Sequence, residues 1–379
     1  MKQWLRNVGR LSVKELRSLF GDMPLMALIL FAFSVAIYST AKGVKAEVAN
    51  ASVAVIDGDH SVLSRRLRDA IRAPYFKPPV EIDRNDVDKA LDRGEFIFIL
   101  DIPPHFEADV LAGRAPAIAL QVDATAMTQA GLGVVYLNEI VLSEMLNFFH
   151  ARGLEAQLPT RSVTRVLFNP NSQSHWFSGV MQIIINVTVL AIILVGAAVI
   201  REREHGTIEH LLVMPVRASE IAMAKIAANG GMILLAVMLS LWFVVHLLLG
   251  VPLAEPLVQS LGLTFLGTAL YLFAVTALGI LLATLASSMP QFGLLAAPVY
   301  VVLYLLSGAA TPVESMPHYI QDIVQFSPTT QFVTFTQAVI YRGAGLDIVW
   351  PQLLAISAAG ALFLFIALTR FRSMLARQG

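Results

Sequence analysis

Long apolar runs and short polar segments alternate along most of this chain. Six runs are long enough to predict helices that cross a bilayer, because about 17–25 apolar residues span its hydrocarbon core. These predicted spans cover residues 23–41, 180–200, 221–249, 258–286, 291–308 and 351–369. The pattern therefore predicts an α-helical membrane protein with six transmembrane helices.

The segment between the first two spans follows a different pattern. Over residues 42–178 charged residues return, and short runs of strand character alternate with helical periodicity. Strands are expected at 52–57, 95–101, 117–122 and 161–168, and helices at 62–72 and 127–152. Such alternation predicts an α/β domain inserted between the spans. At roughly 135 residues the domain is large enough to fold alone.

Two further segments are amphipathic. Residues 1–22 interleave five basic residues with apolar ones, which predicts a helix lying in the membrane interface. Residues 309–350 are too polar for the hydrocarbon core, but amphipathic pieces at 320–326 and 332–341 predict half-inserted helices on the outer side. The first apolar run could instead belong to a signal peptide. It exceeds the usual length of about 7–15 residues, which favours an uncleaved span.

The composition agrees with a surface that faces lipid. The chain has 379 residues, of which 56% are hydrophobic and 14% charged, and soluble domains carry roughly 25% charged residues. The net charge is zero, which argues against nucleic-acid binding. Cysteine is absent from the sequence, so disulfides, thiol catalysis and cysteine-ligated metals are excluded.

The basic residues predict the topology. With both termini inside, the three cytoplasmic segments hold twelve Lys and Arg, whereas the two short outer segments hold only Arg342. The second cytoplasmic segment is counted with Arg201, Arg203, Arg217 and Lys225. The other fourteen basic residues lie in the large domain, which is exempt because long domains cross regardless of charge. Six spans with cytoplasmic termini satisfy the positive-inside rule.

A densely charged stretch, residues 201–216, joins the second and third spans. It reads R-E-R-E-H-G-T-I-E-H-L-L-V-M-P-V, a charge density that hydrocarbon would not accept. Ile208, Leu211 and Leu212 recur at helical spacing, which predicts a short amphipathic helix that Pro215 ends. Its apolar side would face the spans, and its charges would face a soluble partner. The alternative is an ordinary connector with solvated charges.

Motifs for ATP hydrolysis and metal binding are missing or better explained otherwise. The P-loop pattern does not occur, so ATP hydrolysis by that route is excluded. His205 and His210 are five residues apart rather than the four that place two ligands on one helical face, so no metal site is expected. Four aspartates follow predicted strand ends, where turn and helix-cap roles are more frequent than metal binding. These are Asp57, Asp59, Asp101 and Asp123.

Polar residues are few inside the predicted spans. None has Asp, Glu, Lys or Arg deep within it, which argues against a proton- or ion-coupled transporter. Gln182 and Asn186, one turn apart in the second span, predict a hydrogen bond to another helix; a translocation path or dimer seam is the alternative. Two pairs of small residues predict close helix packing. They are Gly279 with Ala283 and Gly293 with Ala297.

Two stretches resemble a known family. Residues 202–216 resemble the cytoplasmic signature of ABC-2-type permeases, the membrane subunits of a class of ABC exporters. A second stretch resembles the family's segment around the fifth span: Ser307-Gly308, Pro312, Glu314, Met316-Pro317 and Pro328-Thr329-Thr330. The whole layout is similar to the branch with a large extracytoplasmic domain between the first two spans.

This resemblance implies a permease subunit that exports hydrophobic or amphipathic, drug- or lipid-like cargo across the bacterial inner membrane. The chain would be no enzyme and hold no cofactor, because a separate ABC ATPase subunit would use ATP and Mg. A second permease chain, identical or similar, would complete a dimer, and the branch often works with a periplasmic adaptor and an outer-membrane duct. Coupling to the ATPase is expected at Arg201, Glu202, Arg203, Glu204, His205, Gly206, Thr207 and Glu209. A translocation path or dimer seam is expected at Gln182, Asn186, Gly308 and Pro312.

The competing hypothesis is a membrane receptor or assembly factor whose extracytoplasmic α/β domain binds a ligand. A P-loop ATPase encoded in a neighbouring gene would favour the exporter. The sequence leaves open the cargo, a homo- or heterodimer, the use of an adaptor and duct, and the role of the large domain.

Overall fold

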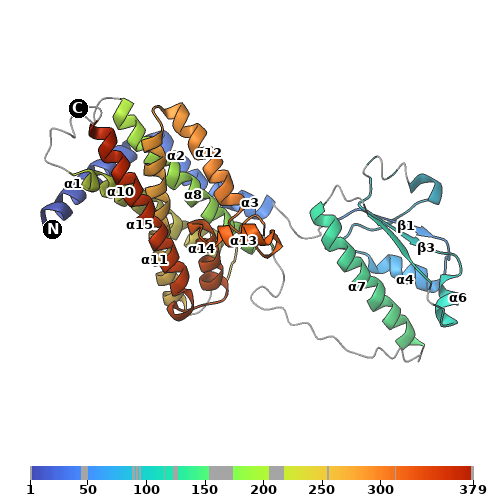
Figure 1. Ribbon diagram of the computed structural model, residues 1–379. Helices are drawn as coiled ribbons and strands as arrows, with labels where there is room; N and C mark the ends of the chain where they lie inside the picture. Colours follow the sequence, from blue (N-terminus) through green and yellow to red (C-terminus); the bar gives the residue numbers. More distant parts are fainter. Residues whose placement is uncertain are drawn as a thin grey trace. The chain divides into compact units, whose positions relative to one another are not determined.

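The computed structural model describes most of the chain (Figure 1). Described are residues 2–43, 50–87, 90, 93, 95–114, 116–122, 127–152, 174–204, 217–253, 256–311 and 313–376. The chain divides into two compact units, Met1–Gly43 with His175–Gly379, and Val44–Ser174.

The first unit is a bundle of helices (Figure 1). Its longer helices are α1 (Lys2–Gly21), α2 (Met23–Ala32), α3 (Val35–Gly43), α8 (Ser174–Glu204), α10 (Ala218–Ser240), α11 (Leu257–Leu285), α12 (Met289–Leu305) and α15 (Leu346–Ala376). The shorter ones are the π-helix Leu241–Leu248, the 3-10 turn Val313–Ser315, α13 (His318–Val324), α14 (Pro328–Thr336) and the π-helix Gln337–Tyr341. Apolar residues lie on every side of most of these helices, as is typical of helices buried in lipid or protein.

Within the described residues, six helices are long and apolar enough to cross a membrane. Five coincide with predicted spans: Met23–Gly43, His175–Glu204, Ala218–Leu248, Leu257–Leu285 and Leu346–Arg370. The sixth, Leu132–Ala151, belongs to the other unit, where a helix of the α/β domain was predicted. The remaining predicted span, α12, has 17 residues. At 1.5 Å per residue it measures about 26 Å, close to the shortest length that crosses a bilayer.

The first span is broken into two helices, because α2 ends at Ala32 and α3 begins at Val35. At the break, the side-chain amide of Asn186 on α8 donates a hydrogen bond to the carbonyl of Ala32. Gln182 donates to Asn186 at 2.9 Å. An unpaired carbonyl in hydrocarbon costs several kcal/mol, so this contact stabilises the break. The predicted hydrogen bond from this polar pair to another helix is confirmed.

α14 packs inside the bundle, against α11 and α15. Tyr271 of α11 donates to the hydroxyl of Thr329 at 3.0 Å, and its ring stacks on Phe332 with the centroids 4.1 Å apart. Most of α14 is buried, so it differs from the half-inserted helix predicted from its amphipathic pattern. α13 does leave apolar side chains exposed, among them Tyr319 and Ile323.

Close packing between helices depends on glycines. A Cβ atom added to Gly196 of α8 would overlap the ring of Phe292 on α12. Gly279 of α11 approaches the backbone of Ile192 so closely that a Cβ atom would lie 2.9 Å from its carbonyl oxygen. The first predicted pair of small residues therefore marks a helix crossing. Gly293 of the second pair has no neighbour within 4 Å among the described residues.

We expect Gly196→Ala to lower the free energy of unfolding by about 1–3 kcal/mol, because the added methyl group overpacks the α8–α12 contact. The matched control is Gly262→Ala in α11, which adds the same methyl group in open space and should be neutral or slightly stabilising. Thermal unfolding of the purified protein in detergent would compare the two variants. Equal melting temperatures would contradict the close approach of Phe292 to α8.

The second unit is built on a four-stranded sheet with the order β2-β1-β3-β4. The strands are β1 (Val53–Asp57), β2 (Val80–Glu81), β3 (Phe98–Ile102) and β4 (Ala119–Val122). β1 is parallel to both of its neighbours, and β4 runs antiparallel to β3 at the edge. β2 was not predicted, because a two-residue strand leaves no alternation to detect. The strand predicted at 161–168 lies outside the described residues.

Helices cover one face of this sheet (Figure 1). They are α4 (Val62–Ala70), α6 (Phe106–Leu111) and α7 (Met127–Ala151). Leu63 of α4 and Leu137 and Phe148 of α7 are buried in the same hydrophobic core as Phe98 of β3. α7 is apolar enough to cross a membrane, but in the structure its buried side belongs to the core of this unit, as predicted for 127–152.

Candidate functional site

The last turn of α8, where the charged stretch begins, is held by the turn between α11 and α12. Arg203 donates to the carbonyl of Ala286 at the end of α11, at 2.6 Å. Glu204 accepts a hydrogen bond from the backbone N–H of Met289 at the start of α12, at 3.0 Å. These two contacts connect the charged end of the second span to the ends of two other helices. A displacement of this end of α8 would therefore also displace the ends of α11 and α12.

A buried ion cluster lies beside this turn. Lys225 of α10 is the central cation, and its side chain is only 2% exposed. Its ammonium group lies 3.1 Å from a carboxylate oxygen of Glu15 on α1 and 2.9 Å from one of Glu202 on α8. Lys14, on the rim, lies 4.0 Å from Glu202. One buried cation therefore joins α8 and α10 to α1, which is about 200 residues away from both in the sequence.

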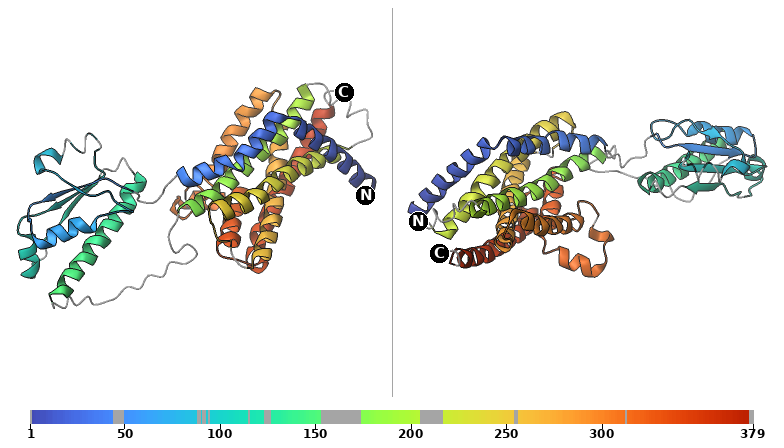
Figure 2. Two further views of the ribbon diagram at one scale, coloured as in Figure 1. Left: turned by 180° about the vertical axis from the view of Figure 1, so that it is seen from behind. Right: turned by 90° about the horizontal axis from the view of Figure 1, so that it is seen from above.

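α1 lies along the first turns of α10, and Figure 2 shows the two helices side by side (α1 in blue, α10 in yellow-green). The side of α1 that faces α10 is partly polar. The sequence had predicted an interfacial helix with apolar residues on the side away from water. Three hydrogen bonds join the two helices besides the ion cluster. They link Trp4 to Ser219, Asn7 to Glu220, and Ser12 to the carbonyl of Ala224.

Two expectations from the sequence differ from this arrangement. Lys225 was predicted as a flanking cytoplasmic charge, but α1 packs over α10 and buries it. Glu202 was expected to face a soluble partner, but its carboxylate is turned inward to Lys225. Arg201 lies at the surface and pairs with Asp22 at the N-terminus of α2, at 3.3 Å. No pattern in the sequence linked Glu15 to this site. The position of Lys225, four residues inside an apolar run, was the feature that could have indicated a buried ion pair.

The other predicted site residues are placed only in part. His205, Gly206, Thr207 and Glu209, and with them the predicted amphipathic helix, lie outside the described residues, as does Pro312. Gly308 follows α12 with a φ of 86°, in the left-handed region that glycine tolerates without strain. A Cβ atom there would also lie 3.1 Å from Val313.

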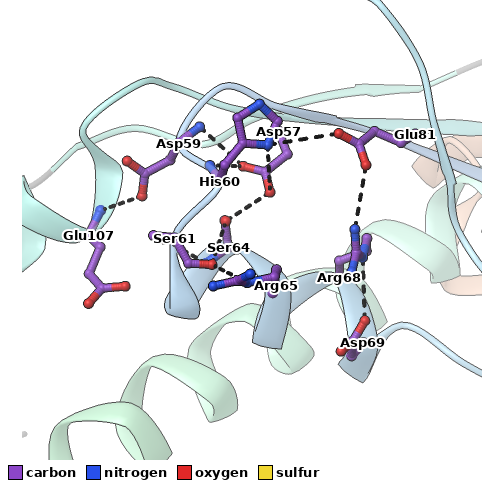
Figure 3. A network of polar contacts seen from close by, with 10 residues as sticks. All are labelled: Asp57, Asp59, His60, Ser61, Ser64, Arg65, Arg68, Asp69, Glu81 and Glu107. Carbon is purple, nitrogen blue, oxygen red and sulfur yellow. Dashed lines mark hydrogen bonds and ion pairs between the residues drawn. The ribbon is translucent and has the colours of Figure 1, made fainter.

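In the second unit, Asp57 and Asp59 act as acceptors for a turn and for helix ends (Figure 3). Asp57 accepts from the backbone N–H groups of Asp59 and His60 at 3.1 and 2.9 Å. The Ser64 hydroxyl donates to the same carboxylate at 2.8 Å. Asp59 accepts from the backbone N–H of Glu107, in the first turn of α6, at 2.9 Å. These are the turn and cap roles predicted for aspartates at strand ends.

The other two aspartates, Asp101 and Asp123, do not extend this group into a metal site among the described residues. Asp101 pairs with Arg84 at 2.7 Å, and Asp123 lies outside the described residues. In the part of the chain that the structure describes, no three His, Cys, Asp or Glu side chains come together as metal ligands would.

Two acidic groups make the stability of this unit depend on pH. Burial acts to raise the pKa of Asp59, but hydrogen bonds from Ser61 and from two backbone N–H groups lower it below its usual value. Burial likewise opposes a lowered pKa of Glu107, which the Leu63 N–H and the Arg152 guanidinium bring about. A carboxyl whose pKa is lower when folded adds stability above its unfolded pKa. That stability is lost as pH falls through the folded pKa.

We expect residues 43–177, expressed alone, to unfold cooperatively and to lose stability as pH falls below the ordinary carboxyl range of about 4. Glu107→Gln should lower stability at pH 7 and flatten this dependence, because it removes one of the titrating groups. Glu95→Gln is the matched control, because it removes a carboxylate from an exposed ion pair with Arg93. Thermal unfolding followed by circular dichroism between pH 7 and 3 would measure both. An unchanged pH dependence in Glu107→Gln would contradict the assignment.

Known proteins that resemble this chain are membrane permeases. The family model described as "ABC-2 family transporter protein" matches residues 22–369. The inner membrane transport permease YhhJ of Escherichia coli K12 is 49% identical over 369 residues, which cover 97% of each chain. Two probable multidrug ABC transporter permeases of the same strain are more distant. YbhR is 26% identical over 90% of this chain and 91% of its own, and YbhS 24% over 95% of both.

Proposed function

Because this chain belongs to the ABC-2 family of transporters, we propose that it is the membrane-spanning subunit of an ATP-driven exporter. Its family and its apolar helices make it a multi-pass inner-membrane permease. The observation that carries the proposal is the charged end of α8, which contacts α2, α10, α11 and α12 at once. Force applied next to Glu204 would reach four helices of the bundle.

The energy for transport would come from a separate subunit. The sequence has no P-loop, so an ABC ATPase would bind ATP and Mg and dock on residues 201–216. In this arrangement Glu204 and the predicted helix after it transmit the ATPase's movement. Glu202 serves inside the bundle, where it holds α8 to α10.

Hydrophobic or amphipathic cargo fits the helices best. Within the described parts of the spans, buried polar groups are mostly hydroxyls and amides, and the buried charges gather near the α8 end. The names of YbhR and YbhS, probable multidrug permeases, agree with drug-like cargo. Export rather than uptake, and the use of a periplasmic adaptor with an outer-membrane duct, remain parts of the proposal that rest on the family resemblance.

A second permease chain would complete the transporter. The side of α12 that carries Gly293 and Ala297 is exposed in the single chain, together with Leu294 and Val301. Small residues four apart allow two helices to approach closely in a membrane, so this side supports a dimer seam.

The unit Val44–Ser174 would lie outside the cytoplasm, with both chain termini inside. We expect reporter fusions at Asp123 and at His210 to show opposite sidedness, since the positive-inside rule places the charged stretch 201–216 in the cytoplasm. Alkaline phosphatase activity at Asp123 and a cytoplasmic fluorescent reporter at His210 would measure this. A cytoplasmic signal from both fusions would refute the six-span topology.

Transport itself is tested with the chain and a candidate ABC ATPase that carries a P-loop, reconstituted together into liposomes. ATP-dependent movement of a fluorescent hydrophobic dye, lost when the ATPase lysine is changed, is the expected result. If the protein is instead a receptor or assembly factor, no ATP-dependent dye movement occurs, and the second unit alone binds a ligand.

A further inference from the structure

A pocket of ≈ 270 Å³ opens beside the buried ion cluster, among residues of α1, α2, α8 and α10. One side of its lining is apolar and includes Leu19, Leu25 and Leu194. The other side is polar and includes Lys14, Arg201 and Asn229. A lining of this kind suits a ligand with a charged end and an apolar end.

Asn229 lines this pocket and carries an unused hydrogen-bond acceptor just behind the pocket wall. Its side chain is 1% exposed, and its amide nitrogen donates to the carbonyl of Lys225 at 2.9 Å. Its carbonyl oxygen is buried and has no partner among the described residues. Leaving such a buried group unsatisfied is energetically unfavourable. Rotating the amide would sacrifice the bond to Lys225, so a donor from outside the chain is the better solution.

Charge is arranged by depth around the pocket. The carboxylates of Glu15 and Glu202 are mostly buried and share the single ammonium group of Lys225. The cations Lys14 and Arg201 are 61% and 51% exposed, on the outer side. The inner end therefore offers acceptor oxygens, and the outer end offers positive charge. A zwitterion with an ammonium group inside and an anionic group outside matches both.

We propose that this pocket binds the headgroup of a phospholipid that carries a primary ammonium group, such as phosphatidylethanolamine. The ammonium group donates to the free oxygen of Asn229, and the phosphate lies near Lys14 and Arg201. The glycerol end packs along the leucines. A trimethylated ammonium group has no N–H to donate, so a choline headgroup leaves Asn229 unsatisfied. The site goes beyond transport and needs only that the chain spans a membrane.

The test is thermal unfolding of the purified full-length chain in detergent, titrated with defined probes. Dioleoyl-phosphatidylethanolamine should raise the melting temperature well above dioleoyl-phosphatidylcholine at the same mole fraction, because ligands that bind the folded state stabilise it. Asn229→Leu should weaken the apparent affinity for the ethanolamine lipid roughly tenfold to a hundredfold, the range of a lost hydrogen bond to a charged group. Lys14→Gln, at an exposed position, should weaken it without harming the fold.

Thr268→Val is the matched control, because Thr268 also buries an unpartnered polar atom but does not line this pocket. It should keep the preference for ethanolamine lipid. Equal stabilisation by the two lipids in the wild-type chain would overturn the site. An ethanolamine preference that survives in Asn229→Leu and Lys14→Gln would overturn it as well. If soluble phosphoethanolamine raises the melting temperature as much as the lipid does at equal concentration, the ligand is the free headgroup compound and not a phospholipid.

Discussion

Lys225→Met should lower the free energy of unfolding by about 3–5 kcal/mol, the usual cost of removing one partner from a buried ion pair. The substitution leaves Glu15 and Glu202 without the buried cation that they share. Both carboxylates are mostly buried, so water replaces the lost ammonium group poorly. Denaturant or thermal unfolding of the purified protein in detergent would measure the loss, with size-exclusion chromatography to confirm that the variant is folded.

Two further variants show where the cost comes from. Lys14→Met removes an exposed cation 4.0 Å from Glu202 and should cost less than about 1 kcal/mol, as surface pairs do. Lys225→Met combined with Glu15→Gln and Glu202→Gln removes all three charges and should recover most of the stability, since uncharged replacements of buried pairs are often tolerated. If Lys225→Met alone is as stable as the wild type, the cluster does not hold α1, α8 and α10 together.

The positions of the spans could be predicted because each depends on a local property. An apolar run of sufficient length has few alternatives, and five of the runs became helices close to their predicted ends. α14 was less predictable. Its threonines gave an amphipathic pattern, but in the structure Thr334 and Thr336 bond carbonyls of their own helix. A threonine satisfied in this way costs little when buried, so the polar residues did not mark an exposed side.

The buried ion cluster could not be predicted, because its members are brought together only by the fold. Glu15 and Lys225 are 210 residues apart, and no periodicity connects them. In the sequence, Glu202 is one of several charges in the stretch 201–216. Only the packing of α1 over α10 shows that its environment differs from that of Glu204. The hydrogen bond from Asn186 was easier to predict, since a polar side chain inside a span commonly forms a hydrogen bond to another helix.

Loss of coupling is the second large effect we expect. Glu204→Ala and Glu209→Ala should each lower cargo-stimulated ATP turnover by roughly 30-fold or more, if each removes a buried charged contact worth about 2–5 kcal/mol. Gly206→Pro should do the same, because proline removes a backbone donor and fixes the turn. Membrane insertion and binding of the ATPase should persist. Glu95→Ala, which removes an exposed carboxylate of the second unit, should leave turnover unchanged.

Glu204→Gln separates two ways in which Glu204 can act. The glutamine oxygen can still accept the hydrogen bond from the Met289 N–H, so the contact between α8 and α12 survives while the charge is lost. If Glu204 acts by holding α12, Glu204→Gln couples normally and only Glu204→Ala fails. If its charge meets the ATPase, both variants fail alike. Normal coupling in Glu204→Ala, Glu209→Ala and Gly206→Pro, with the ATPase still bound, would mean that residues 201–216 are a passive connector and that force enters the bundle elsewhere.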